Sequence, residues 1–131
     1  PALTAGLHWI RLVTPTTDHK RLISVLQNTS GFVYYVSITG ITGTRSADPE
    51  TVKKAITQLR EMTDLPLAVG FGIKSSEQVH TVNEFADAAV VGSALVDTIR
   101  ANLDDNGQPT AELCDNVIEF VQDLASGTVR T

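Results

Sequence analysis

Two segments of the chain share one plan, in which a short apolar strand ends in glycine and turns directly into a helix. Residues 67–73 carry the first copy, with Gly70 and Gly72 before a helical pattern that opens at Ser76. Residues 89–95 carry the second, with Gly92 before Ser93. Backbone N–H groups at the positive end of a helix bind phosphate without any Lys or Arg. The two segments therefore predict a phosphate site at the carboxyl ends of two neighbouring strands.

The order of the predicted elements indicates an α/β fold. Strands are expected at residues 9–13, 31–37, 67–69 and 88–91, and helices at residues 18–27, 48–61, from 76, 94–101 and 111–125. Asp18 and Asp48 are candidate N-caps, residues 75–78 resemble a capping box, and Val52, Ile56 and Leu59 should share one face of the second helix. Short apolar strands that alternate with amphipathic helices form a parallel sheet covered by helices. No linker interrupts the pattern, so residues 1–131 are expected to form a single domain. A complete eight-stranded β/α barrel needs roughly 200 residues, so we expect part of such a barrel.

Composition argues against several kinds of partner. The formal net charge is −5 and no basic cluster exceeds Lys53 and Lys54, so a nucleic acid is not expected as a partner. No apolar run approaches the length of a membrane span, and no membrane partner is expected. The single cysteine, Cys114, is expected to be a small, semi-buried helix residue. Neither the cysteine nor the three histidines have metal-ligand spacing, so no metal site is expected.

The carboxyl ends of the strands carry glycines, hydroxyl groups and one aromatic ring, and they lack titratable side chains. The nearest charged groups are Arg45, Asp48 and Lys74, each in a loop or helix cap. General acid–base catalysis needs a titratable group within hydrogen-bond reach of the reacting atoms. These strand ends are therefore expected to bind a phosphate and an apolar body. Tyr34 and Tyr35 alternate along one strand, so one should face the helices and the other the barrel axis.

Four stretches of the chain resemble one family in order and spacing: residues 11–18, residues 31–37 with 39–43, residues 65–73 and residues 91–96. They are similar to strands five to eight of the tryptophan synthase α subunit family, with its mobile loop after the sixth strand. The tyrosine-rich strand joined to Thr39, Gly40, Thr42 and Gly43 is the most specific of these signals. Ile38 departs from the polar residue that is common there.

The resemblance implies the C-terminal half of a parallel β/α (TIM) barrel, with the N-terminal half absent from this chain. It also implies a carbon–carbon lyase of tryptophan biosynthesis, which cleaves indole-3-glycerol phosphate to indole and glyceraldehyde 3-phosphate without a cofactor. The family passes indole to a pyridoxal-phosphate-dependent β subunit in a heterotetramer, and its members are cytoplasmic. The family's two catalytic carboxylates, a Glu and an Asp, belong to the N-terminal half. No catalytic residue is therefore expected in this chain, and the isolated segment is expected to be inactive.

The resemblance also assigns binding roles to residues of this sequence. Phosphate would be held by Gly43, Gly70, Gly72, Gly92 and Ser93, while Phe71 and Tyr34 would border the indole and glycerol pocket, with Leu12 as a secondary candidate. Thr42 would help to close the site. Two alternatives remain: a non-enzymatic half-barrel that binds phosphate esters or a partner chain, and another phosphate-binding barrel enzyme, such as a phosphoribosyl isomerase-like protein.

Overall fold

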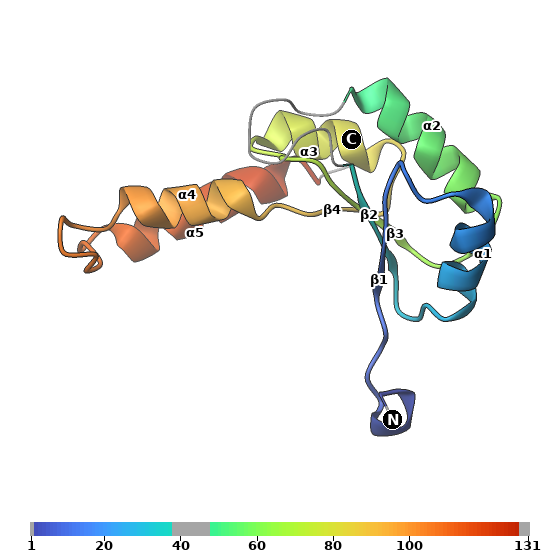
Figure 1. Cartoon of the computed structure of the whole chain (residues 1–131). Helices are drawn as coiled ribbons and strands as arrows, with labels where there is room; N and C mark the ends of the chain where they lie inside the picture. The colour runs from blue at the N-terminus through green and yellow to red at the C-terminus, as the bar shows by residue number, and fades with distance from the viewer. Residues whose placement is uncertain (1, 38–47, 129–131) are drawn as a thin grey trace.

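Four parallel strands, each followed by a helix, form the body of the computed structural model, which describes residues 2–37 and 48–128 (Figure 1). In chain order the elements are η1 (Leu3–Ala5), β1 (Arg11–Val13), α1 (His19–Gln27), β2 (Val33–Val36), α2 (Pro49–Arg60), β3 (Leu67–Gly70), α3 (Ser76–Asn83), β4 (Ala88–Ala89), α4 (Ser93–Ala101) and α5 (Leu113–Ser126). The order predicted from sequence is confirmed, although β1, β2 and β4 are shorter than predicted.

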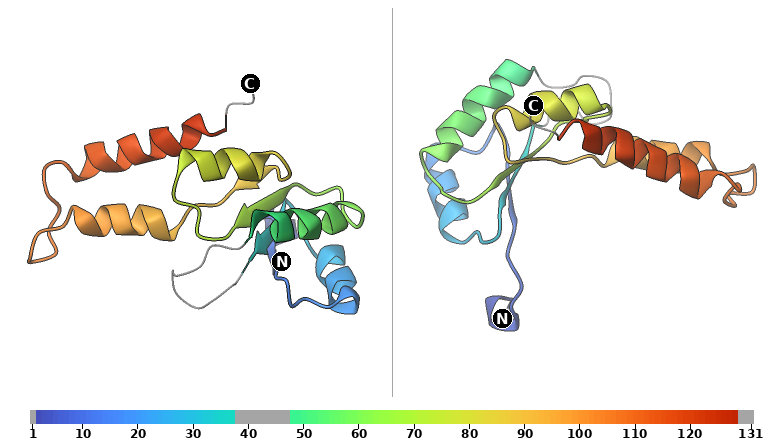
Figure 2. Two further views of the ribbon diagram at one scale, coloured as in Figure 1. Left: turned by 90° about the horizontal axis from the view of Figure 1, so that it is seen from above. Right: turned by 180° about the vertical axis from the view of Figure 1, so that it is seen from behind.

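The strands lie in the sheet in the order β1-β2-β3-β4, and every neighbouring pair is parallel. Each strand thus pairs with the next strand along the chain, which is the winding of a β/α barrel. Figures 1 and 2 show α1, α2 and α3 following one another around one face of this sheet. We call that face the outer face and the opposite one the inner face. The arrangement is that of a half-barrel, as the sequence predicts.

Cross-strand register separates the two faces. Val13, Tyr35 and Val69 lie in one row and are buried with Val33 and Leu67 in the core beneath the helices. The next row contains Leu12, Tyr34 and Ala68 and belongs to the inner face. The predicted alternation of the two tyrosines is confirmed. Tyr35 is 2% exposed, and burial raises the pKa of its phenol.

Two helices begin at aspartate caps that the sequence predicts. Asp18 accepts a hydrogen bond from the Arg21 amide at 2.9 Å, and Asp48 accepts one from the Thr51 amide at 3.2 Å. Pro49 occupies the first turn of α2, where its missing N–H costs nothing. Val52, Ile56 and Leu59 form the buried face of this helix, as their spacing predicts.

Asp87 joins three elements at the edge of the sheet where the strands begin. Its Oδ2 accepts a hydrogen bond from the Leu67 amide at 2.7 Å and lies 2.6 Å from a guanidinium nitrogen of Arg60. The last turn of α2, the start of β3 and the loop before β4 are therefore held by one carboxylate. Both side chains are well exposed, so the ion pair itself adds little stability.

The last two helices extend away from the sheet, side by side (Figures 1 and 2). We call residues 93–128 the arm. The end of α5 contacts the start of α3, where the Ser76 hydroxyl donates to Asp123 Oδ1 at 3.3 Å. Cys114 is exposed on α5, so the expectation of a semi-buried cysteine is wrong. Neither the arm nor any other helix among residues 2–37 and 48–128 has the length and apolar character that crossing a membrane requires.

Candidate functional site

The two glycine turns leave the same edge of the sheet. β3 and β4 are parallel neighbours, and the Val90 amide donates to the Val69 carbonyl at 2.8 Å just past their shared register. Gly70, Phe71 and Gly72 continue from β3, and Val91 and Gly92 continue from β4. Both turns therefore follow carboxyl ends, the edge at which parallel β/α proteins bind their ligands.

Gly72 adopts a backbone conformation that side chains rarely tolerate. Its φ is +78°, and no atom lies within 4 Å of the position that a Cβ would occupy. The open space means that the glycine is required by its backbone angle, since no neighbour crowds it. Gly72 is also exposed.

The start of α3 is already occupied by side chains. Ser75 Oγ accepts from the Gln78 amide at 3.3 Å, and Gln78 Oε1 accepts from the Lys74 amide at 2.7 Å. This pairing is close to the capping box that the sequence predicts. Because these hydrogen bonds use amides at the start of α3, fewer amides remain there for an anion than the glycine-ended strand pattern predicts.

The start of α4 differs from that of α3. Gly92 is the N-cap, and no side chain caps this helix. The first intrahelical bond runs from the Val96 amide to the Gly92 carbonyl, so the amides of Ser93, Ala94 and Leu95 precede it. These three find no partner within the part of the chain that the structure describes. Gly92 and Ser93 are exposed, and a Cβ at Gly92 would meet nothing within 4 Å.

Tyr34 lies against Gly70 on the inner face. A Cβ built on Gly70 would be 2.6 Å from the Tyr34 hydroxyl oxygen and 3.0 Å from Cε2. The phenol of β2 therefore covers the last residue of β3, and glycine leaves the room for it. Sequence reasoning missed this contact, although the pairing of Val36 with Gly70 brings the two strand ends together.

Leu12 and Phe71, which are also predicted site residues, differ in how far they are exposed. Leu12 is 59% exposed in the same cross-strand row as Tyr34. Phe71 is 8% exposed and belongs to the core cluster with Val69, so its role as a pocket wall stays a prediction. Thr42 and Gly43 lie outside the described residues.

Charged and polar groups near this edge serve local structure. Asp48 caps α2, and its hydrogen bond with the Thr51 hydroxyl, at 2.8 Å, is the main reason that the pKa of the carboxyl is below its ordinary value. After β1, the Thr14 hydroxyl lies 3.0 Å from that of Thr16 and 3.2 Å from that of Thr17. Within the described ranges, no three His, Cys, Asp or Glu side chains are grouped to hold a metal ion.

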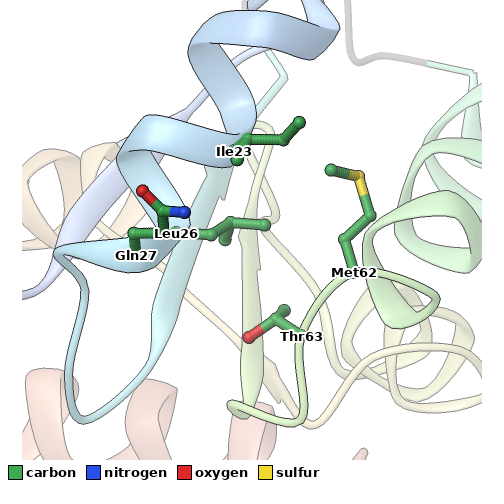
Figure 3. Close-up of a pocket in the computed structure, with 5 residues that line it drawn as sticks. All are labelled: Ile23, Leu26, Gln27, Met62 and Thr63. Carbon is green, nitrogen blue, oxygen red and sulfur yellow. The ribbon is translucent and has the colours of Figure 1, made fainter.

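A separate groove lies between α1 and the segment after α2 (Figure 3). It has a volume of about 320 Å³ and is lined by Ile23, Leu26, Gln27, Met62 and Thr63. These residues stand at the ends of helices that lead into β2 and β3, where those strands begin. The groove is therefore at the opposite edge of the sheet from the glycine turns and is not part of the candidate site.

Comparison with known proteins agrees with the half-barrel fold. Residues 1–126 match the family model described as tryptophan synthase alpha chain. A tryptophan synthase structure from Mycobacterium tuberculosis is 28% identical over 99% of this chain, with a TM-score of 0.80, and 45% of that structure's chain is covered. The tryptophan synthase subunit alpha of Legionella pneumophila is 31% identical over 96% of this chain, with a TM-score of 0.72 and 42% of its own chain covered. This chain thus spans less than half the length of these structures.

Proposed function

The chain belongs to the tryptophan synthase alpha chain family, and we propose that it supplies the phosphate-binding half of a lyase that cleaves indole-3-glycerol phosphate to indole and glyceraldehyde 3-phosphate. In this retro-aldol step the bond between the indole ring and the glycerol carbon breaks. The adjacent hydroxyl loses its proton as the aldehyde forms, and the ring carbon gains one. Both proton transfers need acid–base groups within reach, and residues beyond this chain's span would supply the two carboxylates.

The observation that carries this proposal is the uncapped start of α4 at the same sheet edge as the Gly72 turn. Gly72, Gly92 and Ser93 would contribute amides to the phosphate, together with Gly43 of the loop after β2. Helix amides and a helix dipole hold phosphate well without cationic side chains. Tyr34 and Leu12, which share the inner face, would then contact the indole and glycerol portions, with Gly70 leaving room for Tyr34. Phe71 and Thr42 would complete the closed site.

The proposed function also implies partners for the intact protein. It would act without a cofactor of its own and pass indole to a tryptophan synthase β subunit in a cytoplasmic heterotetramer. Neither a nucleic acid nor a membrane is among the proposed partners.

Calorimetry tests the ligand class directly. The chain is titrated with indole-propanol phosphate, which has both parts of the substrate but no glycerol to cleave, and with inorganic phosphate. We expect at least tenfold tighter binding of the indole ligand, which is about 1.4 kcal/mol. Equal affinity for the two ligands would contradict the lyase assignment and favour a half-barrel that binds phosphate esters in general.

A single substitution tests the proposed phosphate site. Gly92→Val adds a branched side chain at the start of α4, where a Cβ would meet no protein atom within 4 Å. We expect the variant to stay folded and to lose most of its affinity for indole-propanol phosphate. Ser24→Val, on an exposed position of α1, adds apolar surface away from the sheet edge and serves as the control. If folded Gly92→Val binds indole-propanol phosphate with wild-type affinity, the phosphate does not bind at this turn.

A further inference from the structure

Lys74 lies between the glycine turn after β3 and the first turn of α3. It follows Gly72 by two residues, so the two Cα atoms are at most about 7 Å apart. Ile73 is 1% exposed and belongs to the core, whereas Lys74 is exposed. Within residues 2–37 and 48–128, no carboxylate forms an ion pair with Lys74. Its flexible four-carbon stem can therefore bring the ammonium group to a ligand beside Gly72.

The main chain of Lys74 is fixed by the helix that follows it. Gln78 Oε1 accepts from the Lys74 amide at 2.7 Å, and Ser75 Oγ accepts from the Gln78 amide at 3.3 Å. These bonds hold the lysine at the start of α3, which leaves the same edge of the sheet as the start of α4. The Lys74 amide is used within the protein, so the side chain is the part of this residue that remains for a ligand.

Basic side chains are scarce at this edge of the sheet. The connections between each strand and the following helix contain two, Arg45 and Lys74, and Arg45 lies outside the described residues. The arm, which begins at Ser93, has one basic residue, Arg100. Its seven acidic residues are Asp97, Asp104, Asp105, Glu112, Asp115, Glu119 and Asp123, which give it a net charge of −6. Among the described residues, Lys74 is thus the basic residue nearest in sequence to the amides proposed to bind phosphate.

A phosphate ester carries more negative charge than the helix ends can balance. Its charge near pH 7 is about −1.5 to −2, whereas the start of a helix is equivalent to roughly +0.5. The start of α4 has no side-chain cap, while that of α3 is partly used by Ser75 and Gln78. Both helices together supply only about half of the charge that the phosphate needs. An ammonium group adds a full positive charge.

We propose that the ammonium group of Lys74 binds the phosphate of the ligand, beside the amides of Gly72, Gly92 and Ser93. The inference rests on the proposed function, because it adds a side-chain cation to the same site. Lys74 acts on the bound ligand, since the net charge of −5 already includes it and the molecule as a whole still repels an approaching dianion. The site therefore favours a phosphate ester over a neutral indole compound of the same shape.

Calorimetry on the whole chain tests this role with indole-propanol phosphate and with indole-propanol, which lacks the phosphate. Lys74→Gln removes the charge. We expect its Kd for indole-propanol phosphate to rise roughly fivefold, the upper range for an exposed charge pair, and its Kd for indole-propanol to stay unchanged. Lys74→Arg keeps the charge and should restore most of the lost affinity. Lys53→Gln, at an exposed position of α2, is the control and should bind both ligands as the wild type does.

Salt provides a second measurement. Charges are screened beyond about 10 Å at 0.1 M ionic strength and beyond about 3 Å at 1 M. The difference in Kd between the wild type and Lys74→Gln should therefore shrink as salt is added. A purely structural role of the lysine predicts a difference that salt leaves in place.

The outcomes separate this inference from the function on which it rests. If the wild type prefers the phosphate ligand and folded Lys74→Gln keeps that preference in full, the role of Lys74 is overturned and the phosphate site stands. Equal weakening of both ligands would also overturn it, because the lysine would then support the structure of the site. If the wild type binds the two ligands equally, the phosphate site is absent, and the proposed function fails together with the inference.

Discussion

Tyr34 and Gly70 come from neighbouring strands and meet on the inner face of the sheet. The position of the phenol depends on the missing Cβ of Gly70, because that atom would stand 2.6 Å from the Tyr34 hydroxyl oxygen. Gly92 and Gly72 differ from Gly70, since a Cβ at either of them would meet no atom within 4 Å. We propose that Gly70 leaves room for the Tyr34 ring and that the other two glycines give an anion access to this sheet edge.

Gly70→Ala separates ring placement from stability. The added methyl group must push the Tyr34 ring aside, and the ring lies on the partly exposed inner face, where it can rotate. We expect the affinity for indole-propanol phosphate to fall several-fold, while the free energy of unfolding changes by about 1 kcal/mol or less. Calorimetry and urea denaturation provide the two measurements. Unchanged affinity would show that the position of Tyr34 is irrelevant to the ligand.

At the scale of elements, the helices differ in how their starts are satisfied. Aspartates cap α1 and α2, Ser75 and Gln78 cap α3, and α4 begins at a glycine without a side-chain cap. The start of α5 also lacks a side-chain cap, but of these two helices only α4 follows a strand, β4, at the candidate site. Contacts between elements are equally specific, because the end of α5 meets the first turn of α3 through Gly127 and Ser76.

Gly127→Ala should disturb the contact between α5 and α3. A Cβ at this position would overlap the Ser76 carbonyl oxygen and carbon, which are backbone atoms and cannot swing away. We expect the free energy of unfolding to fall by about 1–3 kcal/mol, measured by urea denaturation. Ser126→Ala, at the neighbouring exposed position, is the control and should change it much less. Equal stability of both variants would mean that the arm docks on α3 without close approach.

The cap of α2 should make stability depend on pH in the acid range. The Thr51 hydroxyl, followed by backbone N–H groups, holds the pKa of Asp48 below its ordinary 3.8. A carboxyl with a lowered pKa in the folded state stabilises the fold above its unfolded pKa, and the effect disappears as the pH falls through the folded value. Urea denaturation from pH 6 to pH 2 should therefore show a smaller loss of stability in Asp48→Asn than in the wild type. If the free energy of unfolding changes with pH in the same way in the variant and the wild type, this role of Asp48 is contradicted.

At the scale of the whole molecule, four βα units form half the winding of a barrel, with an acidic arm at one end. The carboxyl ends of its strands carry amides and hydroxyl groups. The proposed function places the binding of an anion within the chain and the acid–base groups outside it.

The isolated chain should therefore bind a substrate analogue without turning over the substrate. We expect no release of indole from indole-3-glycerol phosphate by residues 1–131, while a longer protein that adds the two carboxylates restores it. A colorimetric indole assay makes the comparison, with calorimetry confirming that the isolated chain is occupied. Turnover by the isolated chain would show that an acid–base group within these residues had been overlooked.

The sequence predicts the order of strands and helices because each signal is local. The caps at Asp18, Asp48 and Ser75 and the buried face of α2 depend on neighbours along the chain, and the structure confirms them. Contacts between distant residues were not predictable in this way. Asp87 with Arg60, Tyr34 with Gly70 and Gly127 with Ser76 each join segments whose meeting depends on the fold. Cys114 was misjudged for the same reason, because α5 extends away from the sheet.

The open start of α4 has a kinetic consequence. A phosphate ester is a dianion, and it would approach a protein of net charge −5 whose most acidic segment, the arm, begins at that helix. Amides attract it only at short range, whereas the repulsion from the whole molecule acts over about 10 Å at 0.1 M ionic strength. Added salt shortens this range, so association should become faster as ionic strength rises, the reverse of the behaviour of sites that gather anions with lysine and arginine.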